Sequence, residues 1–353
     1  MKRCISGALA IAGLVVLILD TQTAVEGMKE GLRICLDSAI PSLFPFLVIS
    51  KYLSGHMIGS KIPGLSAIAK CCGIPEGVES LLGIGWIGGY PVGAQCVADA
   101  YRKGFIPKET AERIIGFCNN AGPAFIFGIS AALFPKPGVG WIIFVIQILS
   151  SLSVGIILPG KRKEKSSKIA ALPVTVIQCV QKSIRSMGII CGWILCFRMI
   201  LHYLLRYLMM DNPLLQVLAS GFLELSNGCI GLTKLDSQVT SFVLMNGFLS
   251  LGGICVWMQT SAVAKELSLK QFVLGKILQS SISISLALVS CILIFPDNIN
   301  QNHMIGILVC TLSTTVQIIC MNWKISVASW RKVLYNNRKK CEKRDPYAVS
   351  QRN

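Results

Sequence analysis

Five glycines and a proline lie within one short apolar segment, Gly83-Ile84-Gly85-Trp86-Ile87-Gly88-Gly89-Tyr90-Pro91-Val92-Gly93. Both residue types occur in transmembrane helices, but this density is too high for one continuous helix, because proline removes a backbone donor and glycine weakens the helix. The segment 78–97 is therefore predicted to form two half-helices joined by a non-helical tip, a re-entrant hairpin. Non-helical backbone at membrane depth persists only where it is buried in protein or lines a wet cavity, so the break itself predicts a site.

The composition indicates a membrane protein. Of the 353 residues, 53% are hydrophobic and 14% are charged, and the mean hydropathy is +0.62, whereas about a quarter of the residues in soluble domains are charged. The net charge of +17 gathers in short clusters between apolar runs, at 2–3, 161–165 and 338–344, as the positive-inside rule expects of cytoplasmic ends. These short clusters do not form the folded basic domain that nucleic-acid binding requires. We therefore expect an all-α polytopic protein of the cell membrane.

Uninterrupted and interrupted apolar runs make up the predicted membrane part. The uninterrupted runs are 4–19, 34–54, 140–159, 188–208, 272–295 and 304–322. The interrupted runs, broken by Gly, Pro and Asn, are 78–97, 111–133, 213–232 and 239–258, the last of them at Asn246-Gly247 and Gly252-Gly253. Suppose that the runs 78–97 and 213–232 return to the side from which they enter, while the other two interrupted runs cross the membrane. Most of the 34 basic residues then fall on the cytoplasmic side, and these include the basic residues of loop 259–276. This distribution favours about eight transmembrane helices plus two re-entrant hairpins, with both termini cytoplasmic.

The same arrangement divides the chain into an inverted repeat. We expect an N-terminal transmembrane helix and outer loop at 1–33, a first repeat with its following helix at 34–159, and a second repeat with its following helices at 188–322. A basic loop with an amphipathic interfacial helix at 171–187 occupies 160–187, and a basic cytoplasmic tail occupies 323–353. Inverted repeats with discontinuous helices near the membrane midplane are the architecture of many secondary transporters.

Three motifs resemble those of a known family. They are Ile40-Pro41-Ser42-Leu43-Phe44-Pro45-Phe46, Gly88-Gly89-Tyr90-Pro91-Val92-Gly93-Ala94 and Phe117-Cys118-Asn119-Asn120-Ala121-Gly122-Pro123-Ala124-Phe125. Together they resemble the sporulation integral membrane proteins of endospore-forming Firmicutes, which carry nucleoside-recognition (Gate) domains. Gate domains also form the repeated core of concentrative nucleoside transporters. The resemblance covers about 34–130 and implies a multi-pass membrane protein required in sporulation, for maturation of the spore cortex and envelope.

Glu224 is the main candidate for a binding residue, because it stands in the middle of the interrupted run 213–232. A carboxylate at that depth is costly unless it faces a cavity, pairs with a cation or takes up a proton. We expect it either to bind a substrate or carry a proton, or to cap the N-terminus of a half-helix. Arg198, in the preceding run, is expected either to snorkel to the outer interface or to pair with Glu224.

Amide side chains near the breaks are the other candidates. They are Asn119, Asn120, Gln95, Asn227, Asn246 and Gln259. The first two either satisfy carbonyls freed by the following proline or line a substrate pocket, and Gln95 and Asn227 hold corresponding places in the two predicted hairpins. The residues expected to form the breaks themselves are Gly88, Gly89, Tyr90, Pro91, Gly93, Gly122 and Pro123.

No catalytic residue, metal site or cofactor is expected. The three histidines are scattered along the chain, and neither a Ser/His/Asp arrangement nor a nucleotide-binding loop is recognisable, so the chain is not expected to be an enzyme. Two functions stay open: a transporter-like protein for a small polar solute, nucleoside-like or other, and a non-transporting scaffold or assembly factor in spore-envelope formation. The expected partners are the lipid bilayer, such a solute, and other sporulation membrane proteins or a second copy of the chain, with no nucleic acid.

Overall fold

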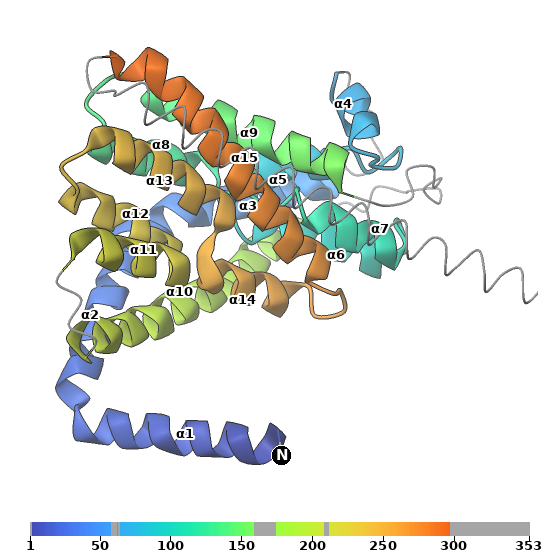
Figure 1. Cartoon of the computed structure of the whole chain (residues 1–353). Helices are drawn as coiled ribbons and strands as arrows, with labels where there is room; N and C mark the ends of the chain where they lie inside the picture. The colour runs from blue at the N-terminus through green and yellow to red at the C-terminus, as the bar shows by residue number, and fades with distance from the viewer. Residues whose placement is uncertain (1, 58–61, 63, 159–173, 208–211, 297–353) are drawn as a thin grey trace, which may run out of the picture.

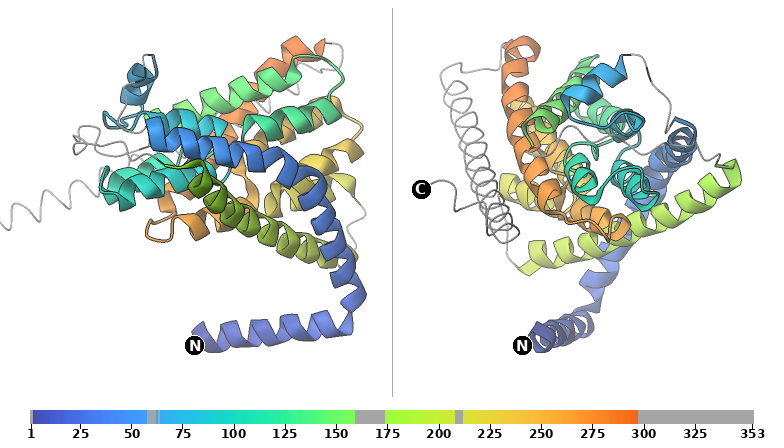
Figure 2. Two further views of the ribbon diagram at one scale, coloured as in Figure 1. Left: turned by 180° about the vertical axis from the view of Figure 1, so that it is seen from behind. Right: turned by 90° about the vertical axis from the view of Figure 1, so that its right-hand side faces the viewer.

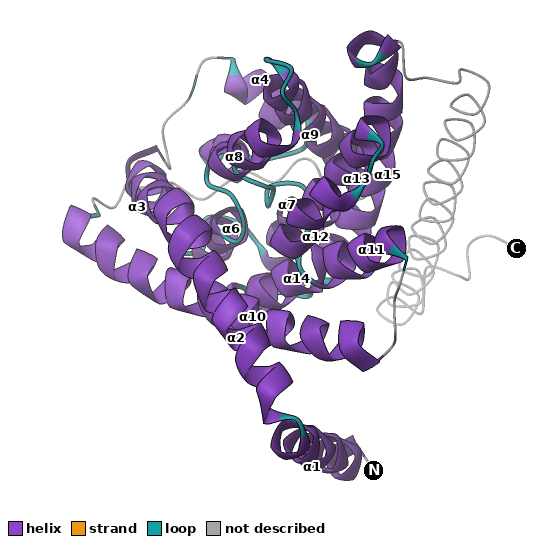
Figure 3. Ribbon diagram, turned by 90° about the vertical axis from the view of Figure 1, so that its left-hand side faces the viewer, coloured by secondary structure: helices purple, strands orange, loops and turns teal. Residues whose placement is uncertain are grey.

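The computed structural model describes residues 2–57, 62, 64–158, 174–207 and 212–296, and this part of the chain is helical with no strand (Figure 3). The predicted run 304–322, the tail 323–353 and residues 160–173 of the basic loop lie outside it. By length and composition, the described helices that can cross a membrane are Val139–Ile157, Val176–Tyr207, Gln238–Val263 and Lys270–Ile294, and the bent pair Ala10–Leu19 with Thr21–Ala39 would make a fifth span. The all-α membrane class is confirmed, while the eight crossings stay a prediction.

The first apolar run and the residues after it form two helices that meet at a sharp bend. α1 (Lys2–Leu19) and α2 (Thr21–Ile34) differ in direction by 96°. The side chain of Asp20 caps α2 by accepting a hydrogen bond from the Thr23 amide at 3.2 Å. α1 lies apart from the rest of the body in every view (Figures 1 and 2). The outer loop expected before residue 34 is therefore wrong, because those residues are helical.

Two glycines explain why this polar segment packs as a helix. Gly27 and Gly31 lie four residues apart on the face of α2 toward α10 (Val176–Tyr207). A Cβ on Gly27 would come within 2.8 Å of the Met199 Cα, and one on Gly31 within 3.2 Å of the Leu195 Cα. Small residues at this spacing allow two helix backbones to approach closely, so α2 packs along α10.

The first interrupted run breaks where its glycines and proline predict. α3 (Ile40–Met57), which continues from a π-helical turn at Cys35–Ala39, and the short α4 (Leu65–Cys71) precede it. α5 (Ser80–Ile87) and α6 (Val92–Arg102) pack against each other and flank a non-helical tip at 88–91. Within this tip Gly89 has a φ of +71°, a conformation that glycine adopts without strain.

Glycines inside these two half-helices make room for another stretch of backbone. A Cβ on Gly85 or on Gly93 would overlap the carbonyl oxygen of Cys118, so the non-helical chain at 116–122 passes close against both helices. Gly93, expected at the break, therefore lies within α6 and serves this contact. The stretch separates α7 (Lys108–Ile115) from α8 (Pro123–Leu133), which confirms the predicted break, and α9 (Val139–Ile157) follows.

The second half begins with a helix longer than the run that predicts it. The amphipathic helix expected at 171–187 is wrong as a separate element, because from Val176 it is continuous with the run 188–208 in the 32-residue helix α10. α11 (Pro213–Leu223) and α12 (Leu225–Gly231) then pack against each other, separated only by Glu224, and a 3-10 turn at Leu232–Lys234 follows. The break predicted in the run 213–232 is confirmed.

The fourth interrupted run breaks at only one of its two predicted places. α13 (Gln238–Leu251) and α14 (Gly253–Val263) are separated by Gly252, which has a φ of +78°. The break expected at Asn246–Gly247 is wrong, because both residues lie within α13. A Cβ on Gly247 would come 3.1 Å from the Ile284 Cδ1 on α15 (Lys270–Ile294), so this glycine permits close helix packing.

Both halves follow the same order of elements. A long helix, a broken helix pair and a broken helix occur as α3, α5–α6 and α7–α8, and again as α10, α11–α12 and α13–α14. α15 joins the halves by packing against α7, α9 and α13. Its buried side chains belong to two hydrophobic clusters, Phe272 and Leu278 to one, Ala287 and Cys291 to the other. This order agrees with the expected repeats, whose boundaries and opposite orientation stay predictions.

Candidate functional site

The breaks of the two halves meet in the protein interior. The Tyr90 hydroxyl, at the tip between α5 and α6, donates a hydrogen bond to the Leu249 carbonyl of α13 at 3.0 Å. A Cβ on Gly252 would come 3.4 Å from the Tyr90 ring, and one on Gly253 3.0 Å from the Gly221 carbonyl of α11. The tip of the first broken pair, the α13–α14 break and the second broken pair therefore lie against one another.

Glu224 caps a half-helix at this meeting point. The residue is 3% exposed, and its carboxylate accepts hydrogen bonds from the backbone amides of Ser226 at 3.0 Å and Asn227 at 2.7 Å. These are two of the amides that the first turn of α12 leaves without helical partners. The structure thus shows the capping role that the sequence offers for Glu224, and the binding role stays a prediction.

A small pocket lies between the halves beside Glu224, with a volume of about 50 Å³. Its polar lining groups are Ser38, Tyr90, Glu224, Ser226 and Gln259. The rest of the wall is apolar and includes side chains of α3, α8, α10 and α14. An apolar hollow with a few convergent polar groups is the usual form of a small-molecule site. In this conformation the pocket has room for a few water molecules, since ordinary ligand pockets start at roughly 300 Å³.

Asn119 and Asn120 connect the two halves instead of lining this pocket. Asn119 accepts a hydrogen bond from the Ala94 amide of α6 at 3.3 Å and donates one to Thr260 Oγ1 of α14 at 3.0 Å. Asn120 donates to the Phe117 carbonyl at 2.8 Å. Both side chains are buried. Asn120 thus donates to a backbone carbonyl of the break, although not to one that Pro123 frees, whereas Asn119 donates to a hydroxyl. The substrate-binding role of both residues stays a prediction.

The side-chain oxygen of Asn120 faces a buried cation, Lys276 of α15. The Lys276 ammonium donates to Gln279 Oε1 at 2.6 Å, to Asn120 Oδ1 at 3.2 Å and to the Tyr90 hydroxyl at 3.3 Å. These acceptors match the three donors of an ammonium group, as burial of a charge requires. Lys276 is fully buried, and none of the carboxylates that the structure places forms an ion pair with it. The expected position of Lys276 in a cytoplasmic loop is therefore wrong. Tyr90 contacts both the Lys276 ammonium and the central pocket, so it links the two.

Buried cations can be indicated by the spacing of polar residues within a helix, which a count of basic residues per loop does not consider. Lys276 and Gln279 are three residues apart, which puts both side chains on one face of a helix whose other residues are mostly apolar or serine. Arg113 is 2% exposed and donates to the backbone carbonyls of Cys72, Gly73 and Gly155. These contacts hold the loop between α4 and α5 against α9.

Gln95 and Asn227 lie away from the central pocket. Gln95 accepts a hydrogen bond from a serine of α10 at 3.1 Å and lines a larger pocket beside that helix. Asn227 accepts one from Arg198 at 2.7 Å. Arg198 also forms an ion pair with Glu30 of α2 at 2.5 Å. The predicted pairing of Arg198 with Glu224 is therefore wrong. Gln95 and Asn227 hold corresponding positions in the two halves, but their side chains do not lie together.

The two amides of the fourth run differ in position. Gln259 lines the central pocket, whereas Asn246 donates a hydrogen bond at 2.9 Å to the Phe242 carbonyl, one turn earlier in α13. Within the described ranges, no group of three or more His, Cys, Asp or Glu side chains is placed to hold a metal ion.

Comparison with known proteins shows a partial similarity. Over 156 residues the chain is 29% identical to the sporulation integral membrane protein YlbJ of Bacillus subtilis (strain 168), and this stretch covers 42% of the chain and 38% of that relative. The similarity therefore spans well under half of the relative's length. No protein-family model matches the chain, and no solved structure matches it significantly. Apolar helices and an integral membrane relative both support a membrane location, while the likeness to Gate domains stays an expectation.

Proposed function

We propose that this protein is a transporter-like membrane protein of sporulation that binds a small polar solute in the central pocket. The observation that carries this proposal is the convergence of Tyr90, Glu224 and Gln259, which come from separate segments of both halves, on one buried pocket. The motifs at 40–46, 88–94 and 117–125, together with the partial similarity to a sporulation integral membrane protein, support the biological setting.

In this proposal the broken pairs α5–α6 and α11–α12 are re-entrant hairpins of a Gate-type inverted repeat. α6 and α11 have 11 residues each, which gives a length of about 16 Å, roughly half of the 30 Å hydrocarbon core. Each pair packs on itself and has its break inside the protein, next to the pocket. Discontinuous helices whose ends meet near the midplane are where secondary transporters bind their solutes.

The chemistry of the pocket favours a solute that donates hydrogen bonds. Each carboxylate oxygen of Glu224 accepts one backbone amide and keeps further acceptor capacity. Hydroxyl, amino or ammonium groups of a solute fit this capacity. A solute of nucleoside size requires the pocket to open beyond its present volume of about 50 Å³, which alternating access of the two halves would provide.

The test is the substitution Glu224→Gln, which keeps the size of the side chain and removes its charge. We expect the variant to lose the yield of heat-resistant spores while its abundance in the membrane stays normal. Glu109→Gln, at an exposed position on α7, is the matched control and should sporulate normally. Uptake of nucleosides, small carboxylates and monovalent cations by purified protein in liposomes identifies the solute. Normal spores from the Glu224→Gln strain would show that the pocket is not used.

A membrane scaffold or assembly factor is the second candidate, and α1 is the observation that favours it. Ile11, Leu14, Ile18 and Leu19 of this helix are between 59% and 80% exposed, and the helix lies apart from the body (Figure 1). Such a helix can pack against another membrane protein. This function predicts that exchanging α1 for an unrelated transmembrane helix abolishes sporulation, whereas Glu224→Gln does not.

A further inference from the structure

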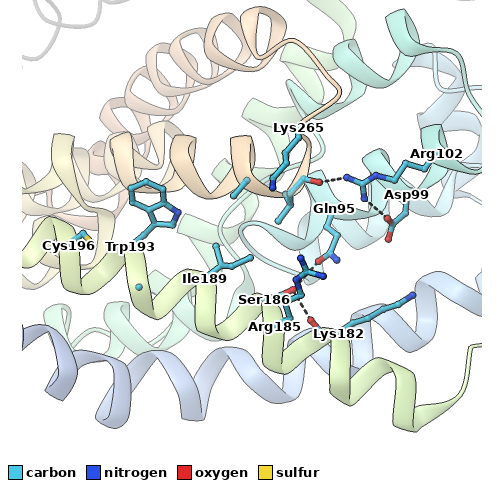
Figure 4. Close-up of a pocket in the computed structure, with 13 residues that line it drawn as sticks. Gln95, Asp99, Arg102, Lys182, Arg185, Ser186, Ile189, Trp193, Cys196 and Lys265 are labelled. Atoms are coloured by element: carbon cyan, nitrogen blue, oxygen red, sulfur yellow. Dashed lines mark hydrogen bonds and ion pairs between the residues drawn. The ribbon is translucent and has the colours of Figure 1, made fainter. Parts of the chain in front are cut away.

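A second, larger pocket of about 760 Å³ lies between α6, α10 and the end of α14 (Figure 4). Its lining has no residue in common with the central pocket. One end of it is strongly charged, with the side chains of Asp99, Arg102, Lys182, Arg185 and Lys265. Four basic groups and one acid leave an excess of positive charge, so this end of the pocket suits an anion.

Within the described part of the chain, most of these basic groups have no carboxylate partner to neutralise them. Arg102 is the exception, because it forms ion pairs with Asp99 at 2.8 Å and Glu266 at 3.0 Å. Lys182 and Arg185 of α10 and Lys265 after α14 make no ion pair with any residue that the structure describes. Figure 4 shows Arg185 and Lys265 entering the pocket from opposite walls. An anion between them would meet cations on two sides.

A buried polar group forms the floor between these walls. Ser186 is 4% exposed, and its hydroxyl donates to Gln95 Oε1 at 3.1 Å. The same hydroxyl accepts a hydrogen bond from the Lys51 ammonium at 2.7 Å, and Lys51 is itself 8% exposed. A further positive charge therefore lies directly beneath the pocket, and it strengthens the attraction for an anion in a region where water screens charge poorly.

The other end of the pocket is apolar and follows α10. Ile189, Trp193 and Cys196 continue along this helix from Arg185, a distance of about 16 Å at 1.5 Å per residue. That distance is roughly the hydrocarbon depth of one membrane leaflet. The lining thus changes from cationic to apolar over the length on which a lipid changes from headgroup to acyl chain.

We propose that this pocket binds an anionic phospholipid, with its phosphate between Arg185, Lys182 and Lys265 and an acyl chain along the Trp193 face of α10. Basic pockets between helices at the membrane surface recognise such headgroups through charge, and the apolar wall adds affinity for the chain. A water-soluble anion would use the cations but leave the apolar wall empty. The site is independent of the solute proposed for the central pocket.

The test measures lipid binding to delipidated protein in detergent by native mass spectrometry. Phosphatidylglycerol is compared with phosphatidylcholine of the same chains and with glycerol 3-phosphate, which has a related headgroup and no chain. We expect phosphatidylglycerol to bind most tightly. The double substitution Lys182→Gln with Arg185→Gln should weaken its binding roughly 30-fold, at about a factor of five per basic group.

The matched control removes the same charge elsewhere. Lys103→Gln with Lys270→Gln neutralises two exposed lysines that do not line the pocket, and it should keep the preference for phosphatidylglycerol. Equal binding of the two phospholipids, or an equal loss in the control, would overturn the proposal. Glycerol 3-phosphate that binds as tightly as the lipid would assign the site to a soluble anion instead.

Discussion

Replacing Asn120 by alanine perturbs the polar cluster that joins the two halves. The Asn120 side chain accepts hydrogen bonds from Lys276 and Gln279 and donates to the carbonyls of Phe117 at 2.8 Å and Gly85 at 3.4 Å. In the alanine variant the Lys276 ammonium loses one of its three acceptors, and the Gln279 amide loses its acceptor. Because these side chains are fully buried, water does not replace the missing group.

The expected magnitude follows from these contacts. Hydrogen bonds inside membrane proteins contribute about 0.6 kcal/mol on average and about 1.7 kcal/mol at most, while a buried group left without a partner costs about 1–3 kcal/mol. The loss of these bonds, one of them to a cation and one long at 3.4 Å, should lower the free energy of unfolding by about 2–4 kcal/mol.

A matched control exists in the same protein. Asn246 is as buried as Asn120, but its side chain donates only one hydrogen bond, to a carbonyl of its own helix. Asn246→Ala should therefore lower the free energy of unfolding by less than about 1 kcal/mol. Unfolding of the purified variants in mixed micelles by added sodium dodecyl sulfate, followed by tryptophan fluorescence, measures the difference.

A double-mutant cycle identifies the cation as the cause. In a Lys276→Met background no ammonium needs the Asn120 oxygen, so Asn120→Ala should cost about 1–2 kcal/mol less than in the native background. An equal loss of stability in Asn120→Ala and Asn246→Ala would contradict this account of the cluster. So would a cost of Asn120→Ala that Lys276→Met leaves unchanged.

Two further substitutions test the backbone contact and a surface ion pair. Gly93→Ala should destabilise the protein by about 3 kcal/mol or more, because its Cβ would overlap the Cys118 carbonyl. Gly83→Ala is the control, because its Cβ would lie 3.5 Å from the nearest atom. This control should be neutral or stabilising in the same unfolding assay. Hydrogen bonds from Arg102 hold the pKa of Glu266 below its usual range. The pair therefore stabilises the fold fully above the ordinary glutamate pKa of about 4.3, and this stabilisation is lost as the pH falls through the lower pKa of the folded state. The difference in thermal midpoint between the native protein and Glu266→Gln should accordingly shrink as the pH falls from about 5 to about 3, and a constant difference would contradict this role.

The positions of most helix breaks follow from the sequence because they have local causes. Glycine and proline change the allowed backbone angles and the donors of their own segment, so the breaks at 88–91, at 116–122 and at Gly252 coincide with such residues. Asn246–Gly247 is the exception. A glycine inside a helix also serves close packing, and that use depends on the helix opposite, which a local pattern does not contain.

The helix α2 and the full length of α10 are also not predicted by the local sequence pattern. Their polar residues predict a loop and a surface helix, yet α2 packs on α10 through Gly27 and Gly31. Backbone approach between two helices contributes stability that hydropathy does not measure.

Composition and backbone preference act residue by residue, so the sequence alone predicts a helical membrane protein with broken segments. Packing between helices places Glu224, Tyr90 and Gln259 in one pocket. The same packing leaves Gln95 and Asn227 outside that pocket and buries Lys276 against Asn120. Those outcomes depend on hydrogen bonds and burial between segments far apart in the chain. The partner of a polar side chain is fixed by which helices pack together, and no spacing along one helix contains that information.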